Sequence, residues 1–109
     1  MHEMSLTQSV VAAIEERLAG ARVVRVRLEI GQLAGVVADS VRFCFDVVTT
    51  GTGLDGALLE IVEPPGRAHC RTCDAMIDLP DLIPLCPCGS AEVDIVGGTE
   101  LLIVEVEVA

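Results

Sequence analysis

The sequence predicts an α+β fold in which two helices cover a small three-stranded sheet and a separate module interrupts the chain. Two observations predict it. Along most of the 109 residues, apolar side chains recur either at the four-residue step of a helix or at the two-residue step of a strand. Residues 66–97 break this pattern, because they hold four of the five cysteines together with prolines and many turn-forming residues.

The first periodic segment, "SLTQSVVAAIEERLAG", predicts a helix. Its apolar residues fall at four-residue steps and form one stripe, which consists of Leu6, Val10, Ile14 and Leu18. Ser5 followed three residues later by Gln8 matches a capping box, so we expect the helix to begin at Ser5. Gly20 is a favourable residue for its end.

The segment "RVVRVRLEIGQLAG" changes to a two-residue period and predicts a strand. One face carries the apolar residues Val24, Val26, Leu28 and Ile30. The charged residues Arg25, Arg27 and Glu29 alternate with them. We therefore expect a strand with one buried and one exposed face.

Helical spacing returns in "VADSVRFCFDVVTTGT". The shared apolar face consists of Val41, Cys44, Phe45 and Val48. Asp39 or Ser40 is a candidate N-cap for this second helix. We expect Cys44, on the apolar face, to be a buried small hydrophobic residue.

Two further strands are predicted on either side of the cysteine-rich module. "GALLEIVEPPG" is a short strand that Pro64 and Pro65 stop. In "ELLIVEVEVA", one face holds Leu102, Val104, Val106 and Val108, and Glu105 and Glu107 lie on the other. The two prolines and the glycine pair at 97–98 are the expected hinges of the module. We therefore expect residues 1–65 and 98–109 to form one α/β domain, and residues 66–97 to form an inserted domain.

The charge balance limits the classes of partner. Seventeen acidic residues against seven arginines give a net charge of −10, which argues against binding to nucleic acid or to an anionic membrane. No apolar run approaches the roughly 20 residues that cross a bilayer, and no basic-then-apolar leader is visible. We expect a cytoplasmic protein, in which disulfides rarely persist.

The cysteines of the module predict a metal site. Cys70 and Cys73 form C-x-x-C, and after twelve intervening residues Cys86 and Cys88 form C-x-C. Two such turns can place four thiolates around one Zn²⁺, so the module is zinc-ribbon-like and its zinc structural. A redox dithiol and an iron–sulfur site are the alternatives. His69 is either an exposed neighbour or an auxiliary ligand, because the second pair is one residue short of the usual spacing.

The stretch "MHEMS" offers a second set of ligands. The α-amino group of Met1, with an ordinary pKa of about 7.7–8.0, could join the amide and imidazole nitrogens of His2 in a planar set that suits Ni(II) or Cu(II). Glu3 adds a carboxylate. Many proteins also carry an early histidine by chance, and the residues alone leave both interpretations open.

Several segments taken together resemble the HypA/HybF family of hydrogenase maturation factors. They are "MHEMSL", "GQLAGVVADSVRFCFD", "TGLDGALLEI" and "CRTC…CPCGS", and they run in order along essentially the whole chain. The resemblance implies a nickel-binding α/β domain interrupted by a zinc domain. It implies a non-enzymatic metallochaperone that delivers Ni(II) to the large-subunit precursor of a [NiFe]-hydrogenase. The implied partners are a maturation GTPase and, in some relatives, urease maturation factors.

The resemblance also assigns residues. His2 matches the essential nickel ligand, together with the Met1 amine. Glu3 matches an acidic neighbour that is either a ligand or a partner contact. Asp39 matches an acidic residue that can join the nickel sphere, with the helix N-cap as the alternative. The zinc thiolates are Cys70, Cys73, Cys86 and Cys88. We expect a monomer or weak homodimer; the competing hypothesis is a zinc-ribbon adaptor whose N-terminus carries no nickel.

Overall fold

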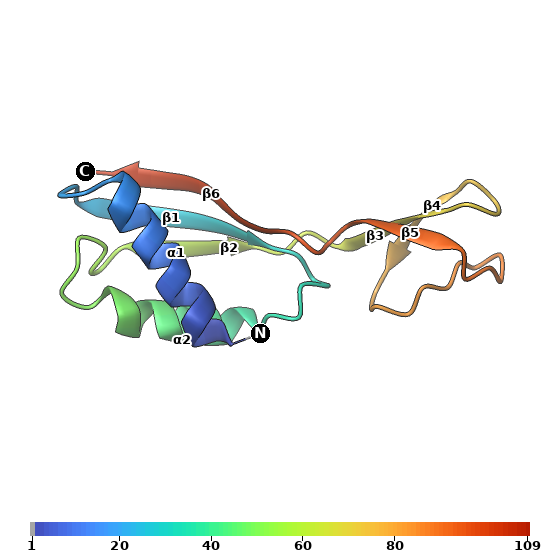
Figure 1. The fold of residues 1–109 in the computed structure, drawn as a ribbon, viewed down its shortest axis with the longest axis horizontal. Helices are drawn as coiled ribbons and strands as arrows, with labels where there is room; N and C mark the ends of the chain where they lie inside the picture. Colours follow the sequence, from blue (N-terminus) through green and yellow to red (C-terminus); the bar gives the residue numbers. More distant parts are fainter. Residues whose placement is uncertain (1) are drawn as a thin grey trace.

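The computed structural model describes residues 2–109 as two small sheets joined end to end (Figure 1). The molecule is elongated, with extents of 53 × 21 × 18 Å. In chain order the elements are α1 (Glu3–Arg17), β1 (Val23–Ile30), α2 (Ala38–Thr49), β2 (Leu58–Val62), β3 (Gly66–Cys70), β4 (Met76–Leu79), β5 (Val93–Gly97) and β6 (Leu101–Val108). Among the helices of residues 2–109, none is long and apolar enough to cross a membrane.

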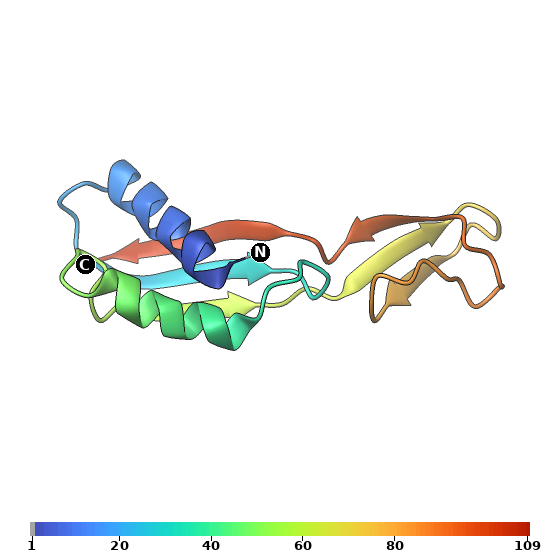
Figure 2. The same cartoon turned by 60° about the horizontal axis from the view of Figure 1, so that its bottom comes forward.

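The first sheet has the strand order β2-β1-β6, with β1 parallel to β2 and antiparallel to β6. Because parallel neighbours need a crossover, α2 connects β1 to β2 and packs back onto the sheet. Both helices cover the same face (Figure 2), where Val11 of α1 and Phe45 of α2 meet Val26 of β1 in one buried core. The predicted α+β fold, a three-stranded sheet covered by two helices, is confirmed.

The opposite face of this sheet carries charged side chains. Arg25, in the central strand, contacts Glu60 of β2 and also Glu105 and Glu107 of β6. Arg27 forms a second ion pair with Glu60. The guanidinium of Arg25 thus connects all three strands of the sheet. The predicted alternation of charged and apolar residues along β1 agrees with the structure from Arg25 onward.

Both helices begin earlier than the capping patterns predicted. The N-cap of α1 is His2, and the backbone N–H of Leu6 already donates to the His2 carbonyl, so Ser5 is inside the helix. The N-cap of α2 is Val37, which excludes Asp39 and Ser40 as caps. Neither start has a side-chain cap from its own N-cap residue, and the capping predictions were wrong. Glu3 and Met4 favour helix, so α1 extends to the third residue.

Two strand faces were also assigned incorrectly. The pairing of β1 with β6 skips Val24, so Val23 is buried and Val24 is 39% exposed. The same pairing skips Val104, which moves Leu101 and Ile103 to the helix side and turns Leu102 and Val104 outward. A bulge inserts one unpaired residue and reverses the alternation beyond it.

The second sheet is antiparallel, has the order β4-β3-β5, and lies at the far end of the molecule (Figure 1). Its small buried core consists of Ala68, Leu79 and Leu33. Leu33 comes from the loop between β1 and α2, and its backbone N–H donates to the Gly98 carbonyl at 2.7 Å. At this junction a Cβ on Gly31 would overlap the carbonyl of Gly98, so the two backbones approach closely only because residue 31 has no side chain.

Candidate metal sites

Four cysteines gather at the tip of the second sheet. Cys70 ends β3 and Cys73 lies in the turn that follows, whereas Cys86 and Cys88 lie in the long connection from β4 to β5. Their four sulfur atoms all lie within 4.8 Å of one another. Cys70 Sγ is 3.8 Å from Cys88 Sγ, and Cys73 Sγ is 3.7 Å from Cys86 Sγ. The pairs that are separate in the sequence form one cluster.

The spacing of these sulfur atoms fits a single tetrahedral ion. A Zn–S bond of about 2.3 Å places the corners of a tetrahedron about 3.8 Å apart, which is the separation seen in both cross pairs. A disulfide would require about 2.05 Å, and all five cysteines of the chain are free. The geometry therefore favours a four-thiolate zinc site over a disulfide-forming dithiol.

Backbone turns explain how Cys86 and Cys88, which have only one residue between them, still place both sulfur atoms in the cluster. Gly89 has a φ of +93°, and its N–H donates to the carbonyl of Cys86 at 2.8 Å. Only glycine adopts this left-handed conformation without strain, so the chain reverses directly after Cys88. The hydroxyl groups of Thr72 and Ser90 lie 2.7 Å apart and connect the two turns. The tight turn that contains Cys86 and Cys88 is therefore compatible with the four-sulfur cluster.

The thiols of the cluster have unequal pKa values. The backbone N–H of Cys73 points at Cys70 Sγ from 3.5 Å and lowers the pKa of Cys70 to about 6. The backbone N–H of Cys88 acts in the same direction on Cys86, but burial and the neighbouring cysteines outweigh it and raise the pKa of Cys86 to about 12. Four adjacent thiolates repel one another, so full ionisation requires a cation at the centre.

His69 lies on β3 beside the cluster but is not one of the grouped residues. Its ring Nε2 is 2.6 Å from Asp74 Oδ1, and 35% of its side chain is exposed. Asp74, which directly follows Cys73, has a φ of 60°. An auxiliary role of His69 at the metal stays a prediction.

A second candidate site lies where the starts of the two helices meet. A pocket there is lined from α1 and its N-cap by His2, Glu3 and Met4, and from α2 by Asp39, Ser40, Phe43 and Cys44. The carboxylate of Glu3 also accepts a hydrogen bond from the backbone N–H of Val37 at 3.3 Å. The structure thus brings His2, Glu3 and Asp39 to one pocket, although they are more than 30 positions apart in the chain.

The candidate ligands in this pocket differ in their exposure to solvent and in the contacts that they make. The carboxylate of Asp39 is 94% exposed and pairs with Arg42 at 3.1 Å, one turn along α2. Cys44 is 8% exposed, which confirms the predicted buried position. Within residues 2–109, only the four cysteines bring three or more ligand atoms within bonding range of one ion. The Met1 amine, predicted as a nickel ligand, lies outside the described residues.

Sequence reasoning did not place Ser40 and Phe43 in the lining of this pocket, and it missed the contact of Val37 with Glu3. Asp39 and Phe43 are four residues apart and therefore share a helix face, a signal that was available. The contact of Val37 with Glu3 has no such signal, because it depends on how α1 crosses α2.

Comparison with known proteins decides the family. A family model described as "Hydrogenase/urease nickel incorporation, metallochaperone, hypA" matches residues 1–108. The chain belongs to the HypA family. Hydrogenase maturation factor HypA of Trichormus variabilis is 49% identical, over 99% of this chain and 96% of that protein. The same factor of Geobacter metallireducens is 46% identical, over 99% of each chain.

Solved HypA structures share the fold. The solution structure of the Ni metallochaperone HypA from Helicobacter pylori matches with a TM-score of 0.68 and 25% identity, over 99% of this chain and 97% of that one. A second HypA solution structure matches with a TM-score of 0.72 over the whole of this chain and 97% of that one, and at 24% identity it supports the fold alone. Because the HypA family consists of metallochaperones, the prediction of a non-enzymatic maturation factor is confirmed.

Proposed function

We propose that this HypA-family chain carries Ni(II) at its N-terminus and delivers it to the large-subunit precursor of a [NiFe]-hydrogenase. The observation that carries the proposal is the pocket where His2 and Glu3 meet Asp39 of α2. One side chain from each helix start can thus approach a single ion. Membership of a nickel-incorporation family supports the same cargo.

The backbone of His2 suits a planar nitrogen site. His2 is the N-cap of α1, with extended φ and ψ of −82° and 119°. The first N–H groups of a helix have no partner within it, so the amide of His2 can ionise under a bound metal without breaking a helical hydrogen bond. With the Met1 amine and the His2 imidazole it forms the nitrogen set that Ni(II) prefers. Glu3 and Asp39 then supply carboxylates.

Release of the ion follows from the position of this site. His2 is exposed and stands ahead of an anchored helix, so a partner's ligands can replace the chain's ligands one at a time. The net charge of −10 raises the local concentration of cations and attracts a basic partner surface. We propose that the partners are the maturation GTPase and the hydrogenase precursor, and in some settings urease maturation factors, all in the cytoplasm. The chain would act as a monomer or weak homodimer.

We further propose that Cys70, Cys73, Cys86 and Cys88 hold a structural Zn²⁺ within an inserted domain of residues 66–97. Four thiolates close the tetrahedron and leave no position for substrate. Zinc would supply the cation that this thiol cluster requires and would fold a segment with few buried apolar side chains.

Nickel titration of the zinc-loaded, tag-free chain tests the carrier proposal. We expect one Ni(II) per chain by calorimetry and a planar, nitrogen-rich absorption spectrum. His2→Ala should abolish this binding and leave the circular dichroism and zinc content unchanged. His69→Ala is the matched control, because His69 is the only other histidine. Unchanged nickel affinity in His2→Ala, or a thiolate-dominated spectrum, would reject the proposal.

One observation favours the alternative, a zinc-ribbon adaptor. The connection after β4 exposes three large aliphatic side chains, Leu82, Ile83 and Leu85, at 61%, 63% and 56%. An adaptor would tolerate a short Gly-Ser extension before Met1, whereas a carrier would lose hydrogenase maturation because the amine is blocked. Maturation activity of the extended chain, compared with the native one in a strain that lacks the factor, separates the two.

A further inference from the structure

The strand β6 is an edge of the first sheet. Its inner edge pairs with β1, and among residues 2–109 no strand pairs with its outer edge. The backbone N–H and C=O groups on that side are therefore available to another extended chain. The bulge at Val104 divides the strand, and the part from Leu101 to Ile103 lies nearest the second sheet.

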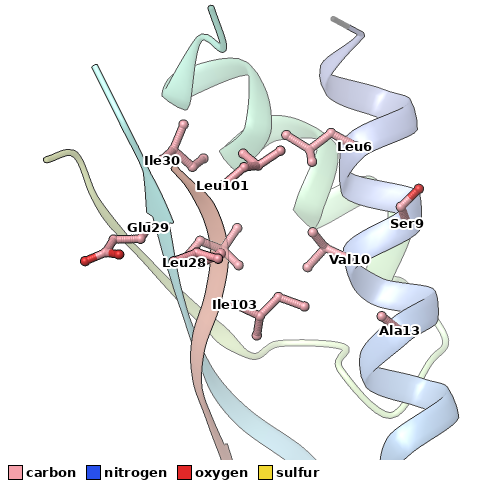
Figure 3. Close-up of a pocket in the computed structure, with 10 residues that line it drawn as sticks. Leu6, Ser9, Val10, Ala13, Leu28, Glu29, Ile30, Leu101 and Ile103 are labelled. Atoms are coloured by element: carbon pink, nitrogen blue, oxygen red, sulfur yellow. The ribbon is translucent and has the colours of Figure 1, made fainter. Parts of the chain in front are cut away.

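An apolar groove runs along this part of the edge, between β6 and α1 (Figure 3). Leu6, Val10 and Ala13 form its helix wall, and Leu101 and Ile103 form its strand wall. The side chains of both walls point toward one another across the groove (Figure 3). A groove between a helix and an unpaired edge strand is the geometry in which an extended peptide is added to a sheet.

The other face of the same edge carries the exposed Leu102 and Val104 beside the groove, and acidic side chains beyond the bulge and on the neighbouring strand β1. Glu29 points away from α1 (Figure 3), and Glu105 and Glu107 are on the strand beside it. Arg25 contacts two of these three carboxylates, whereas Glu29 has no ion pair within the described residues. Successive residues of a strand point to opposite sides, so a strand added here would present alternate side chains to the apolar groove and to the face that carries Leu102 and these three glutamates.

We propose that the α1–β6 groove binds an extended segment of a partner protein in which apolar residues alternate with Lys or Arg. Its apolar side chains would fill the groove, its basic side chains would face the three glutamates, and its backbone would pair with β6. A second copy of this chain is the less favourable occupant, because pairing β6 with β6 adds Glu105 and Glu107 to a face that is already acidic.

The test uses an eight-residue peptide, equal in length to β6, in which valine and lysine alternate and both ends are blocked. Binding to the full zinc-loaded chain is followed by amide NMR shifts and by fluorescence polarisation. We expect shifts confined to β6 and the facing side of α1. An isomer with its valines and lysines in separate blocks, a valine–glutamate peptide and a peptide methylated at alternate backbone nitrogens should each bind at least about tenfold more weakly.

A matched pair of variants locates the site on the protein. Ala13 lines the groove and Ala12 does not, although both are exposed on α1. Ala13→Arg should weaken peptide binding by about tenfold or more, because it places a charge and bulk in the groove, and Ala12→Arg should leave it unchanged.

Equal binding of the block isomer or the methylated peptide, or shifts elsewhere on the chain, would overturn the proposal. A concentration-dependent dimer that Ala13→Arg dissociates in sedimentation would assign the edge to a second copy instead, and would also overturn it. None of these outcomes bears on nickel binding at His2.

Discussion

The carboxylate of Glu3 accepts a hydrogen bond from the backbone N–H of Val37, with the two atoms 3.3 Å apart. Val37 is the N-cap of α2 and provides no side-chain cap of its own. A residue at the start of one helix therefore satisfies a backbone donor at the start of the other. This bond joins the two helix starts that form the walls of the pocket lined by His2, Glu3 and Asp39.

Substitutions at Glu3 can separate this structural role from metal binding. Glu3→Ala should lower the free energy of unfolding by about 0.5–2 kcal/mol, as loss of a helix cap does, and should weaken nickel binding. Glu3→Gln keeps an acceptor oxygen but loses the charge, so we expect near-native thermal stability with reduced nickel affinity. Glu16→Ala, on the exposed side of α1, is the control. Native nickel affinity in both Glu3 variants would show that Glu3 is a cap only.

Removal of zinc should unfold one sheet and spare the other. The second sheet has only Leu33, Ala68 and Leu79 in its buried core, whereas the first has nine buried residues. Hydrogen exchange after chelation should therefore show lost protection at Ala68 and retained protection at Val26. Cys44→Ala, outside the cluster, should leave the zinc content at one ion per chain. Equal loss of protection in both sheets would contradict this division.

Leu33→Ala should destabilise the second sheet although residue 33 precedes it by more than thirty positions. Removal of a buried leucine side chain costs about 2–5 kcal/mol, and Leu33 is 8% exposed. Leu82→Ala, in the cysteine-rich segment but 61% exposed, should change stability by less than about 0.5 kcal/mol. The free energy of local opening, measured from amide exchange in β3, distinguishes the two. A larger effect of Leu82→Ala would disprove the assignment of Leu33 to this core.

The ion pairs of Arg25 predict an acid-dependent loss of stability. The Arg25 guanidinium, followed by that of Arg27, holds the pKa of Glu60 below its ordinary value of 4.5. A carboxyl group with a lowered folded pKa contributes stability above its ordinary pKa and loses it as the pH falls through the folded value. Glu60→Gln should therefore be less stable than the native chain above pH 4.5, and this difference should shrink toward zero on acidification.

Amide exchange in β1 is the appropriate measurement for Glu60, because acid also protonates the zinc thiolates at the other end of the molecule. Glu63→Gln, at an exposed position just beyond β2, should show no such difference at any pH. A stability difference for Glu60→Gln that persists unchanged below pH 4.5 would refute the electrostatic explanation.

Periodicity was sufficient for the elements that bury one face. Such periodicity predicted the two helices, the three strands of the first sheet and their order along the chain, because burial repeats with the geometry of each element, but it did not predict the three strands of the second sheet. The spacing of the four cysteines likewise predicted their cluster, since short C-x-x-C and C-x-C turns bring sulfur atoms together locally.

Contacts between elements that are distant in the chain could not be predicted from local sequence patterns. The bulges at Val24 and Val104 depend on the register between β1 and β6, which a single strand does not specify. The capping pattern at Asp39 was wrong because α2 begins one residue earlier, where the carboxylate of Glu3 accepts from the backbone N–H of Val37 across the helix pair. Leu33 gave no signal either, since a lone leucine in a loop does not indicate which core it will enter.

The position of Leu33 bears on how this architecture could be inherited or engineered. A segment cut at residues 66 and 97 would leave behind one of the three buried side chains of its sheet. It would also lose the hydrogen bond from Leu33 to Gly98. The cysteine-rich segment therefore cannot be transplanted as a cassette: recombination that moves it to another scaffold must supply an equivalent of the loop after β1, or select a new apolar residue to replace it.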